Sequence, residues 1–289
     1  MIKIASMVGG PDLKKATLAP YSGDLRAAFG KLAALGYDGA ELMVKDPQDL
    51  EGSKIRGWLE EFGLRFVGIC TGHVFFEDGL GLIESGPRTS QAALTRIREL
   101  IDLAAAISPG DALVTIGRAR GMGELPKPEE TWRLAVEAFQ ELAGYAQPRG
   151  IRLVLEPLSP KEATFVLSTV EGIRMVESVN HPNFGLMLDV YHMNLTDGNV
   201  AEAFRRAGSR CWHVHVADPD RRSPASGTID YRAAMGALED IGYSGFVSTE
   251  IQPWPDPDTA ARASIEFLRS QLPGAERLGL PAKGRGHGG

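Results

Sequence analysis

Four strand-like runs in the second half of the chain each end in a titratable side chain. The runs are IRLVLE, GLMLD, CWHVHV and GFVSTE, and the groups at or near their ends are Glu156, Asp189, His215 and Glu250. Burying three carboxylates and an imidazole together is unfavourable, because like charges repel and each group loses its hydration. One bound divalent cation would remove that penalty. Oxygen-rich ligation with a single nitrogen favours Mn²⁺, with Mg²⁺, Co²⁺ or Fe²⁺ as alternatives, over zinc.

The alternation of side chains along a strand allows these groups to meet. Successive side chains of a strand point to opposite faces. We therefore expect His213 and His215 to share one face of their run, with Trp212 on the other, and Met187 to share a face with Asp189. The four end groups can then converge on one axis. His213 would lie one layer deeper, either as a hydrogen-bonded core histidine or behind a metal ligand.

The elements that would position these residues alternate along the whole chain. Short apolar runs, rich in β-branched residues, are separated by stretches whose apolar residues recur every three or four positions. The predicted strands are 2–6, 39–44, 65–70, 112–117, 151–156, 185–189, 211–216 and 245–250, and helical stretches include 24–36, 91–107, 129–147 and 259–272. This order predicts an α/β protein with a single (β/α)8 barrel, whose active site lies at the C-terminal ends of the strands.

The organisation of the chain favours one closed barrel over two domains. No Pro/Gly-rich linker interrupts the middle of the 289 residues, and closure removes exposed sheet edges. We expect a catalytic domain over residues 1–275. The remaining segment, 276–289, is Gly-rich and lacks an apolar pattern, which predicts a disordered tail.

Composition excludes several classes of partner. The formal charge of -6 gives no general attraction for nucleic acid or anionic lipid. No stretch is apolar enough to span a membrane, and the start lacks the apolar core of a signal peptide. The two cysteines, Cys70 and Cys211, form no CxxC motif, which favours a reducing compartment. We therefore expect a cytoplasmic protein.

Other polar residues give weaker signals. Glu41, in DGAELMV, is either an internal hydrogen-bond acceptor or a site residue, and His73, after RFVGICTG, either lines the mouth of the barrel or caps a loop. His192 follows the run that ends at Asp189. Arg221, in DPDRRSP, is typical of a solvated loop unless an anionic or hydroxylated group lies nearby.

At these residues the chain resembles the xylose-isomerase-like TIM-barrel superfamily, in the branch of ketose 3-epimerases and hydroxypyruvate isomerases. That branch carries metal ligands Glu, Asp, His and Glu on strands five to eight, which implies this role for Glu156, Asp189, His215 and Glu250. LDVYHMN is similar to its Asp-x-x-His-Met-Asn signature, and HVHVADPDRR to its His-Val-x-x-x-x-Arg loop. The resemblance therefore implies that His192 and Arg221 bind substrate.

The resemblance extends to Glu162 and departs elsewhere. Glu162, six positions after Glu156, stands where the epimerases have a further substrate-binding acid. The preceding residues are SPKE, however, in place of the family's Asn-Arg. The aromatic segments that line the family's substrate pocket are replaced by SMVGGPD and GRARGMGEL. The metal chemistry is thus better supported than the identity of the sugar.

The resemblance implies a divalent-metal-dependent isomerase or epimerase that acts on a ketose or keto-sugar through a cis-enediolate. Glu156 and Glu250, from different sides of the metal, would form the acid/base pair. The partner would be a small-molecule sugar, and the resemblance implies a homo-dimer or homo-tetramer.

Three alternatives use the same residues. A lyase or dehydratase acting on a keto-inositol or a 3-keto-glycoside would form the same enediolate and then expel a leaving group. An endonuclease-type phosphodiesterase shares the superfamily, but six histidines and a charge of -6 argue against its His-rich site and basic surface. A non-enzymatic metal-binding module is the third alternative.

Overall fold

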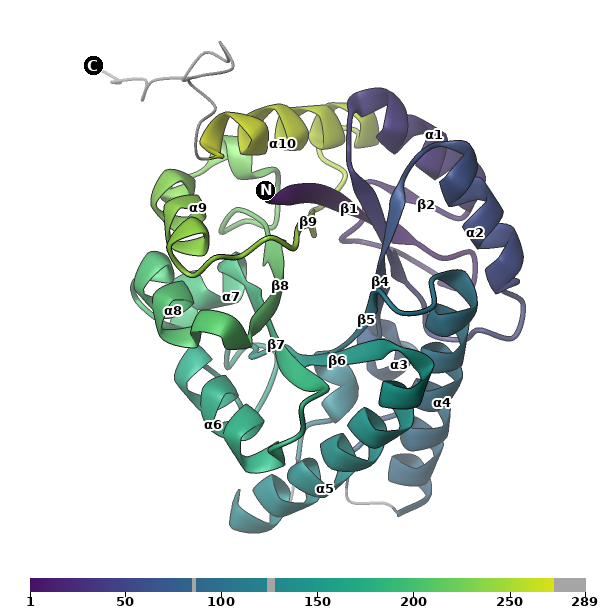
Figure 1. Ribbon diagram of the computed structural model, residues 1–289, viewed down its shortest axis with the longest axis vertical. Coiled ribbons are helices and arrows are strands. Elements are labelled where there is room, and N and C mark those ends of the chain that lie inside the picture. The colour runs from purple at the N-terminus through teal and green to yellow at the C-terminus, as the bar shows by residue number, and fades with distance from the viewer. Residues whose placement is uncertain (85–86, 124–127, 273–289) are drawn as a thin grey trace.

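The computed structural model describes residues 1–84, 87–123 and 128–272, which form a closed parallel barrel (Figure 1). Every strand pairs with its neighbours in parallel, in the order β2-β1-β3-β4-β5-β6-β7-β8-β9, and β1 also pairs with β9. The strands are β1 (Lys3–Gly9), β2 (Tyr21–Ser22), β3 (Gly39–Met43), β4 (Arg65–Cys70), β5 (Ala112–Ile116), β6 (Ile151–Leu155), β7 (Phe184–Asp189), β8 (Cys211–Val216) and β9 (Phe246–Thr249). The two-residue β2 lies beside the end of β1, so the other eight strands make the barrel wall.

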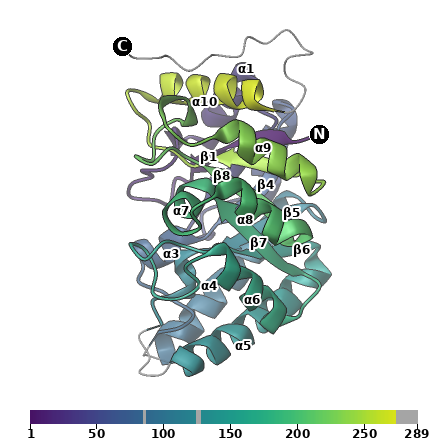
Figure 2. The same cartoon turned by 90° about the vertical axis from the view of Figure 1, so that its left-hand side faces the viewer.

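Long helices surround the barrel, and two short helices lie near the ends of strands (Figures 1 and 2). The outer helices are α1 (Leu25–Leu35), α2 (Gly52–Glu61), α4 (Pro87–Ile107), α5 (Pro128–Ala146), α6 (Thr169–Val179), α8 (Val200–Ala207), α9 (Tyr231–Asp240) and α10 (Pro257–Gln271). The short helices α3 (Gly72–Phe76) and α7 (Val190–Thr196) follow the C-terminal ends of β4 and β7. None of the described helices is long and apolar enough to cross a membrane.

Local sequence explains where these elements begin and end, as α1 illustrates. The Asp24 carboxylate accepts a hydrogen bond from the Ala27 amide and caps the start of the helix. Gly36, at a φ of 86°, ends the helix in the left-handed conformation. Between them, Leu25, Phe29 and their apolar neighbours are buried against the barrel, as the spacing of apolar residues predicts.

The predicted fold class is confirmed, and the predicted strands and helices agree with the structure to within a few residues. The catalytic domain over residues 1–275 stays a prediction, because its boundary lies outside the described residues. The tail 276–289, predicted to be disordered, lies outside them as well.

The predicted orientation of Trp212 is wrong. Along the β7–β8 ladder, Leu186 pairs with Cys211 and the next residue, Met187, pairs with His213, so Trp212 is an extra residue at a bulge. Its ring packs with Leu113 and Met187 inside the barrel instead of against the helices. A β-bulge interrupts the alternation of side chains between the two faces of a strand. A prediction that assumes strict alternation cannot detect such an interruption.

The seam of the barrel joins the first and last of the described strands. β1 and β9 pair over four positions, from Lys3 with Phe246 to Ser6 with Thr249. The Thr249 hydroxyl also donates a hydrogen bond to the Ser6 hydroxyl at 3.0 Å, on the same helix-facing side of the wall as Ile4 and Val247. This seam supports β9 at the point where the chain continues into Glu250.

Candidate active site

The structure brings the four strand-end residues together at the C-terminal ends of neighbouring strands. Asp189 and His215 are paired directly across the β7–β8 ladder, while Glu156 and Glu250 directly follow β6 and β9. All four are buried, with exposed fractions of 7% or less. Ligand atoms of Glu156, His215 and Glu250 lie within 4.8 Å of one another. The convergence predicted from alternation is therefore observed.

Arg221 lies at the centre of this cluster and is not a solvated loop residue. Its Nη1 donates to Asp189 Oδ2 and to Glu250 Oε2, each at 2.7 Å. The guanidinium also lies 3.8 Å from the ring centroid of Tyr191. Arg221 has a φ of 60°, a conformation that non-glycine residues rarely adopt and that often marks functional sites. A tight turn holds it there, because its amide donates to the Asp218 carbonyl at 2.8 Å.

His192 faces the same space from α7. The Asp189 carboxylate caps this helix by accepting from the Tyr191 amide, so His192 is one turn from Asp189. The Ser159 amide donates to Nδ1 at 3.1 Å, and the Arg221 guanidinium, which can only donate, faces Nε2. Nε2 lies 3.0 Å from Arg221 Nη2 and 3.8 Å from carboxylate oxygens of Glu156 and Asp189. His192 and Arg221 thus lie side by side at the site.

Burial lowers the pKa of His192 to about 4. The negative charge of Asp189 raises this pKa by less than burial lowers it, and the positive charge of Arg221 lowers it further. The imidazole is therefore neutral at pH 7. A neutral imidazole can accept a hydrogen bond at one ring nitrogen and donate one from the other.

Glu41 links the two buried histidines of β8. Its Oε2 accepts from His213 Nε2 at 2.7 Å and from His215 Nε2 at 3.0 Å. Burial alone would raise the pKa of Glu41, but His213 and His215 outweigh it and hold the pKa well below its ordinary value. Glu41 is thus ionised and fixes the orientation of both rings.

The three carboxyl groups at the strand ends have different proton affinities. Burial raises the pKa of Glu156 well above its ordinary value, and the nearby Glu250 and Asp189 raise it further. Burial also raises the pKa of Glu250, despite the opposing effect of Arg221. For Asp189, Arg221 outweighs burial and lowers the pKa. Glu156 and Glu250 can therefore bind and release protons more readily than Asp189.

The residues fit a divalent cation. His215 Nδ1 is fully buried and has no hydrogen-bond partner among the described residues, although the other ring nitrogen is engaged by Glu41. A Cβ on Gly117 would lie 2.3 Å from Glu156 Oε2, so the glycine leaves room for this carboxylate. Carboxylate oxygens with one imidazole nitrogen form a donor set for Mn²⁺, Mg²⁺ or Co²⁺. Glu156, Asp189, His215 and Glu250 would hold the ion.

The other predicted residues lie at different distances from this cluster. Glu162 Oε1 is 3.6 Å from Arg221 Nη2, at the edge of the site. His73 lies on α3, where its Nε2 is 3.3 Å from the Lys15 carbonyl oxygen and its ring is near Phe76. None of its described contacts is with the four strand-end residues.

Two arginines after β5 were missed by the sequence analysis. Arg118 Nε lies 3.5 Å from Glu162 Oε2, and its guanidinium stacks 4.4 Å from the Phe76 ring centroid. Arg120 is fully buried and donates to carbonyl oxygens in the loops after β5 and β6, including that of Glu156 at 2.8 Å. Their position just beyond a predicted strand end was the available signal, but nothing in the sequence separates them from surface arginines.

Comparison with known proteins supports the predicted family. The sequence profile of the family described as Xylose isomerase-like TIM barrel matches residues 29–271. The L-ribulose 3-epimerase of Methylomonas sp. is 28% identical over 268 residues, covering 85% of this chain and 91% of that protein. The D-psicose 3-epimerase of Ruminiclostridium cellulolyticum is 36% identical over 162 residues, covering 49% of this chain and 55% of that protein.

A solved structure supports the fold independently. The structure of an L-ribulose 3-epimerase superposes with a TM-score of 0.81 at 21% identity, covering 99% of this chain and all of that one. The two sequence relatives are enzymes named as ketose 3-epimerases, which is the class that the sequence analysis predicted. The predicted family is confirmed, and the chain belongs to the xylose isomerase-like TIM barrel family.

Proposed function

We propose that this protein is a divalent-metal-dependent ketose 3-epimerase. The observation that carries the proposal is the pair Glu156 and Glu250, two buried carboxyl groups that directly follow β6 and β9, with β7 and β8 between these strands. Inversion at a carbon next to a ketone requires one base and one acid on opposite sides of that carbon. The named activities of the relatives support the same reaction.

The two glutamates would share the proton transfers. In one direction, the Glu156 carboxylate removes the proton from C3 and Glu250, in its acid form, donates a proton to the opposite face. The roles reverse for the other epimer, so no proton is gained or lost overall. A bound divalent cation would supply polarisation of the ketone oxygen, which lowers the pKa of the adjacent C–H. Positioned proton transfer typically contributes about 10²- to 10⁴-fold to such rates.

The remaining site residues would orient the sugar. His192 and Arg221, 3.0 Å apart at Nε2 and Nη2, would bind substrate oxygens. Glu162, beside Arg221, would accept a hydrogen bond from a sugar hydroxyl. Asp189, with its lowered pKa, remains ionised, so its role would be to hold the cation and the Arg221 guanidinium.

The finer assignments rest on chemistry and family resemblance. Mn²⁺ is the physiological metal that we propose, because the donor set combines hard oxygens with one nitrogen. We infer a cytoplasmic homo-dimer or homo-tetramer, with a small sugar as the ligand.

The test is proton exchange from solvent. The purified protein with Mn²⁺ should incorporate deuterium at C3 of a ketose in D₂O and yield both C3 epimers with an intact carbon skeleton. Glu250→Gln should abolish formation of the C3 epimer and still bind Mn²⁺, while Glu60→Gln, an exposed control on α2, should behave like the parent. Loss of water or of an aglycone would instead identify a lyase. Failure to exchange any ketose in a broad panel would refute the proposal.

A further inference from the structure

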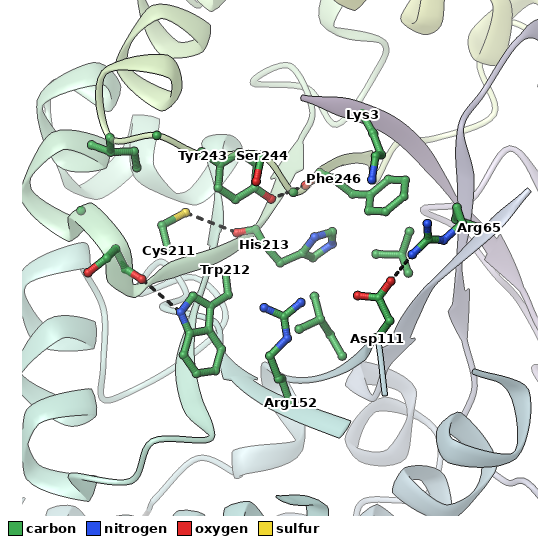
Figure 3. Close-up of a pocket in the computed structure, with 17 residues that line it drawn as sticks. Lys3, Arg65, Asp111, Arg152, Cys211, Trp212, His213, Tyr243, Ser244 and Phe246 are labelled. Atoms are coloured by element: carbon green, nitrogen blue, oxygen red, sulfur yellow. Dashed lines mark hydrogen bonds and ion pairs between the residues drawn. The ribbon is translucent and has the colours of Figure 1, made fainter. Parts of the chain in front are cut away.

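A second cavity lies at the opposite end of the barrel from the candidate active site. It has a volume of about 380 Å³ and is lined by residues at or near the N-terminal ends of strands. Lys3, Arg65 and Arg152 are each the first or second residue of β1, β4 and β6. Figure 3 shows these three basic side chains around the cavity, with Trp212 and Phe246 among its aromatic lining residues.

The charge in this cavity is only partly balanced. Arg65 forms an ion pair with Asp111. Over residues 1–84, 87–123 and 128–272, neither Lys3 nor Arg152 has a carboxylate within ion-pair distance; each lies instead near an aromatic ring. Lys3 Nζ is 5.2 Å from the ring centroid of Phe246, and the Arg152 guanidinium is 5.6 Å from that of Trp212. Two positive charges therefore remain uncompensated in a chain whose formal charge is -6.

The polar groups of the aromatic walls are already engaged within the protein. The Trp212 indole N–H donates to the Ser209 carbonyl at 3.0 Å, and the Tyr243 hydroxyl donates to the Phe246 carbonyl at 2.6 Å. These bonds fix the rings and leave apolar faces toward the cavity. The charge-bearing donors available to a ligand are thus those of the three basic residues.

We propose that this cavity binds a small oxyanion, the carboxylate or phosphate group of a metabolite, between Arg152 and Lys3. The planar guanidinium matches two oxygens of such a group, and the ammonium adds a point charge. Rings beside both cations restrict their motion, which lowers the entropy lost on binding. The proposal does not depend on the proposed epimerase activity, although His213, which also lines the cavity, shares the Glu41 carboxylate with His215.

The indole N–H signals of the four tryptophans provide a local readout. The ¹⁵N-labelled full-length chain, loaded with Mg²⁺, would be titrated at constant ionic strength with inorganic phosphate and, separately, with malonate. The Trp212 signal can be assigned from its loss in Trp212→Phe. We expect this signal to shift saturably with at least one anion. Comparison of the Kd values for phosphate and malonate then shows whether the site prefers a phosphate or a carboxylate group. Trp254 reports on the other end of the barrel, because its ring lies 3.8 Å from the guanidinium of Arg222, next to Arg221.

Arg152→Gln should raise the Kd of the bound anion, measured from the Trp212 signal, by about tenfold or more, as expected for a lost charge-assisted hydrogen bond. Arg152→Lys should retain part of the affinity. Arg133→Gln removes the same charge from an exposed pair on α5 and should leave the Kd unchanged. The proposal is overturned if neither anion moves the Trp212 signal, if only Trp254 responds, or if Arg152→Gln and Arg133→Gln bind equally well.

Discussion

Glu41 and His215 are joined by a hydrogen bond of 3.0 Å that determines which ring nitrogen faces the three strand-end carboxylates. Because Nε2 is engaged by Glu41, Nδ1 points toward Glu250, whose Oε2 is 3.9 Å away. Hydrogen bonds of this kind fix the orientation and basicity of metal-binding imidazoles. Glu41 is therefore a positioning residue, and its substitution provides the first prediction.

Glu41→Gln should weaken the affinity for Mn²⁺ by about 10- to 100-fold, the range found when such partners are removed. Isothermal titration of the metal-depleted protein measures this effect without any assay of turnover. Circular dichroism would verify that the variant is folded, and Glu60→Gln serves as the matched control. An unchanged Mn²⁺ affinity in a folded variant would show that the hydrogen bond does not position His215.

Arg118 should affect substrate binding more than turnover. It contacts Glu162 at 3.5 Å but none of the four strand-end residues in the described contacts. Arg118→Gln should therefore raise KM for the ketose several-fold and change kcat little, because a charge at the edge of the site acts equally on substrate and transition state. Steady-state kinetics beside Arg133→Gln tests this. A fall in kcat at constant KM would place Arg118 in the chemical step instead.

Asp218 should make stability depend on pH. Burial, with a contribution from Asp220, raises its pKa from 3.8 to about 6. The folded state binds the Asp218 proton more tightly than the unfolded state does. The resulting contribution to the free energy of unfolding is fully present below about pH 4 and is lost as the pH rises through about 6. Asp218→Asn should match the parent at pH 4 and be more stable at pH 8, by at most about 3 kcal/mol. Urea unfolding at both pH values measures this, and an equal effect at both would contradict it.

Arg120 should contribute strongly to the free energy of unfolding. Its guanidinium, 0% exposed, donates to the carbonyls of Gly117, Glu156, Phe165 and Val166 at 2.8–3.2 Å. Arg120→Leu would leave these acceptors unpaired and should lower the free energy of unfolding by about 3 kcal/mol or more. The surface variant Arg205→Leu, which removes an exposed ion pair with Asp240, should lose no more than about 1 kcal/mol. Comparable losses in both variants would contradict this.

The sequence was most informative where periodicity and position coincide. Strand runs that end in Glu156, Asp189 and His215 predicted both the barrel and the end at which polar groups gather, since parallel strands all end at the same face. Arg221 could not be placed from the residues alone, because its burial depends on a left-handed turn and on carboxylates from β7 and β9. Trp212 was misplaced because a bulge leaves no mark in the alternation of apolar residues.

The seam between β1 and β9 has a consequence for how the protein acquires activity. The hydrogen bond between Ser6 and Thr249 joins residues 243 positions apart, and contacts of such separation form slowly because chain entropy opposes them. Glu250 comes directly after this seam, at the end of a strand only four residues long. During biosynthesis the nascent chain must therefore extend through β9 before this carboxylate is fixed. Activity should appear late in refolding, after most of the helical signal has returned.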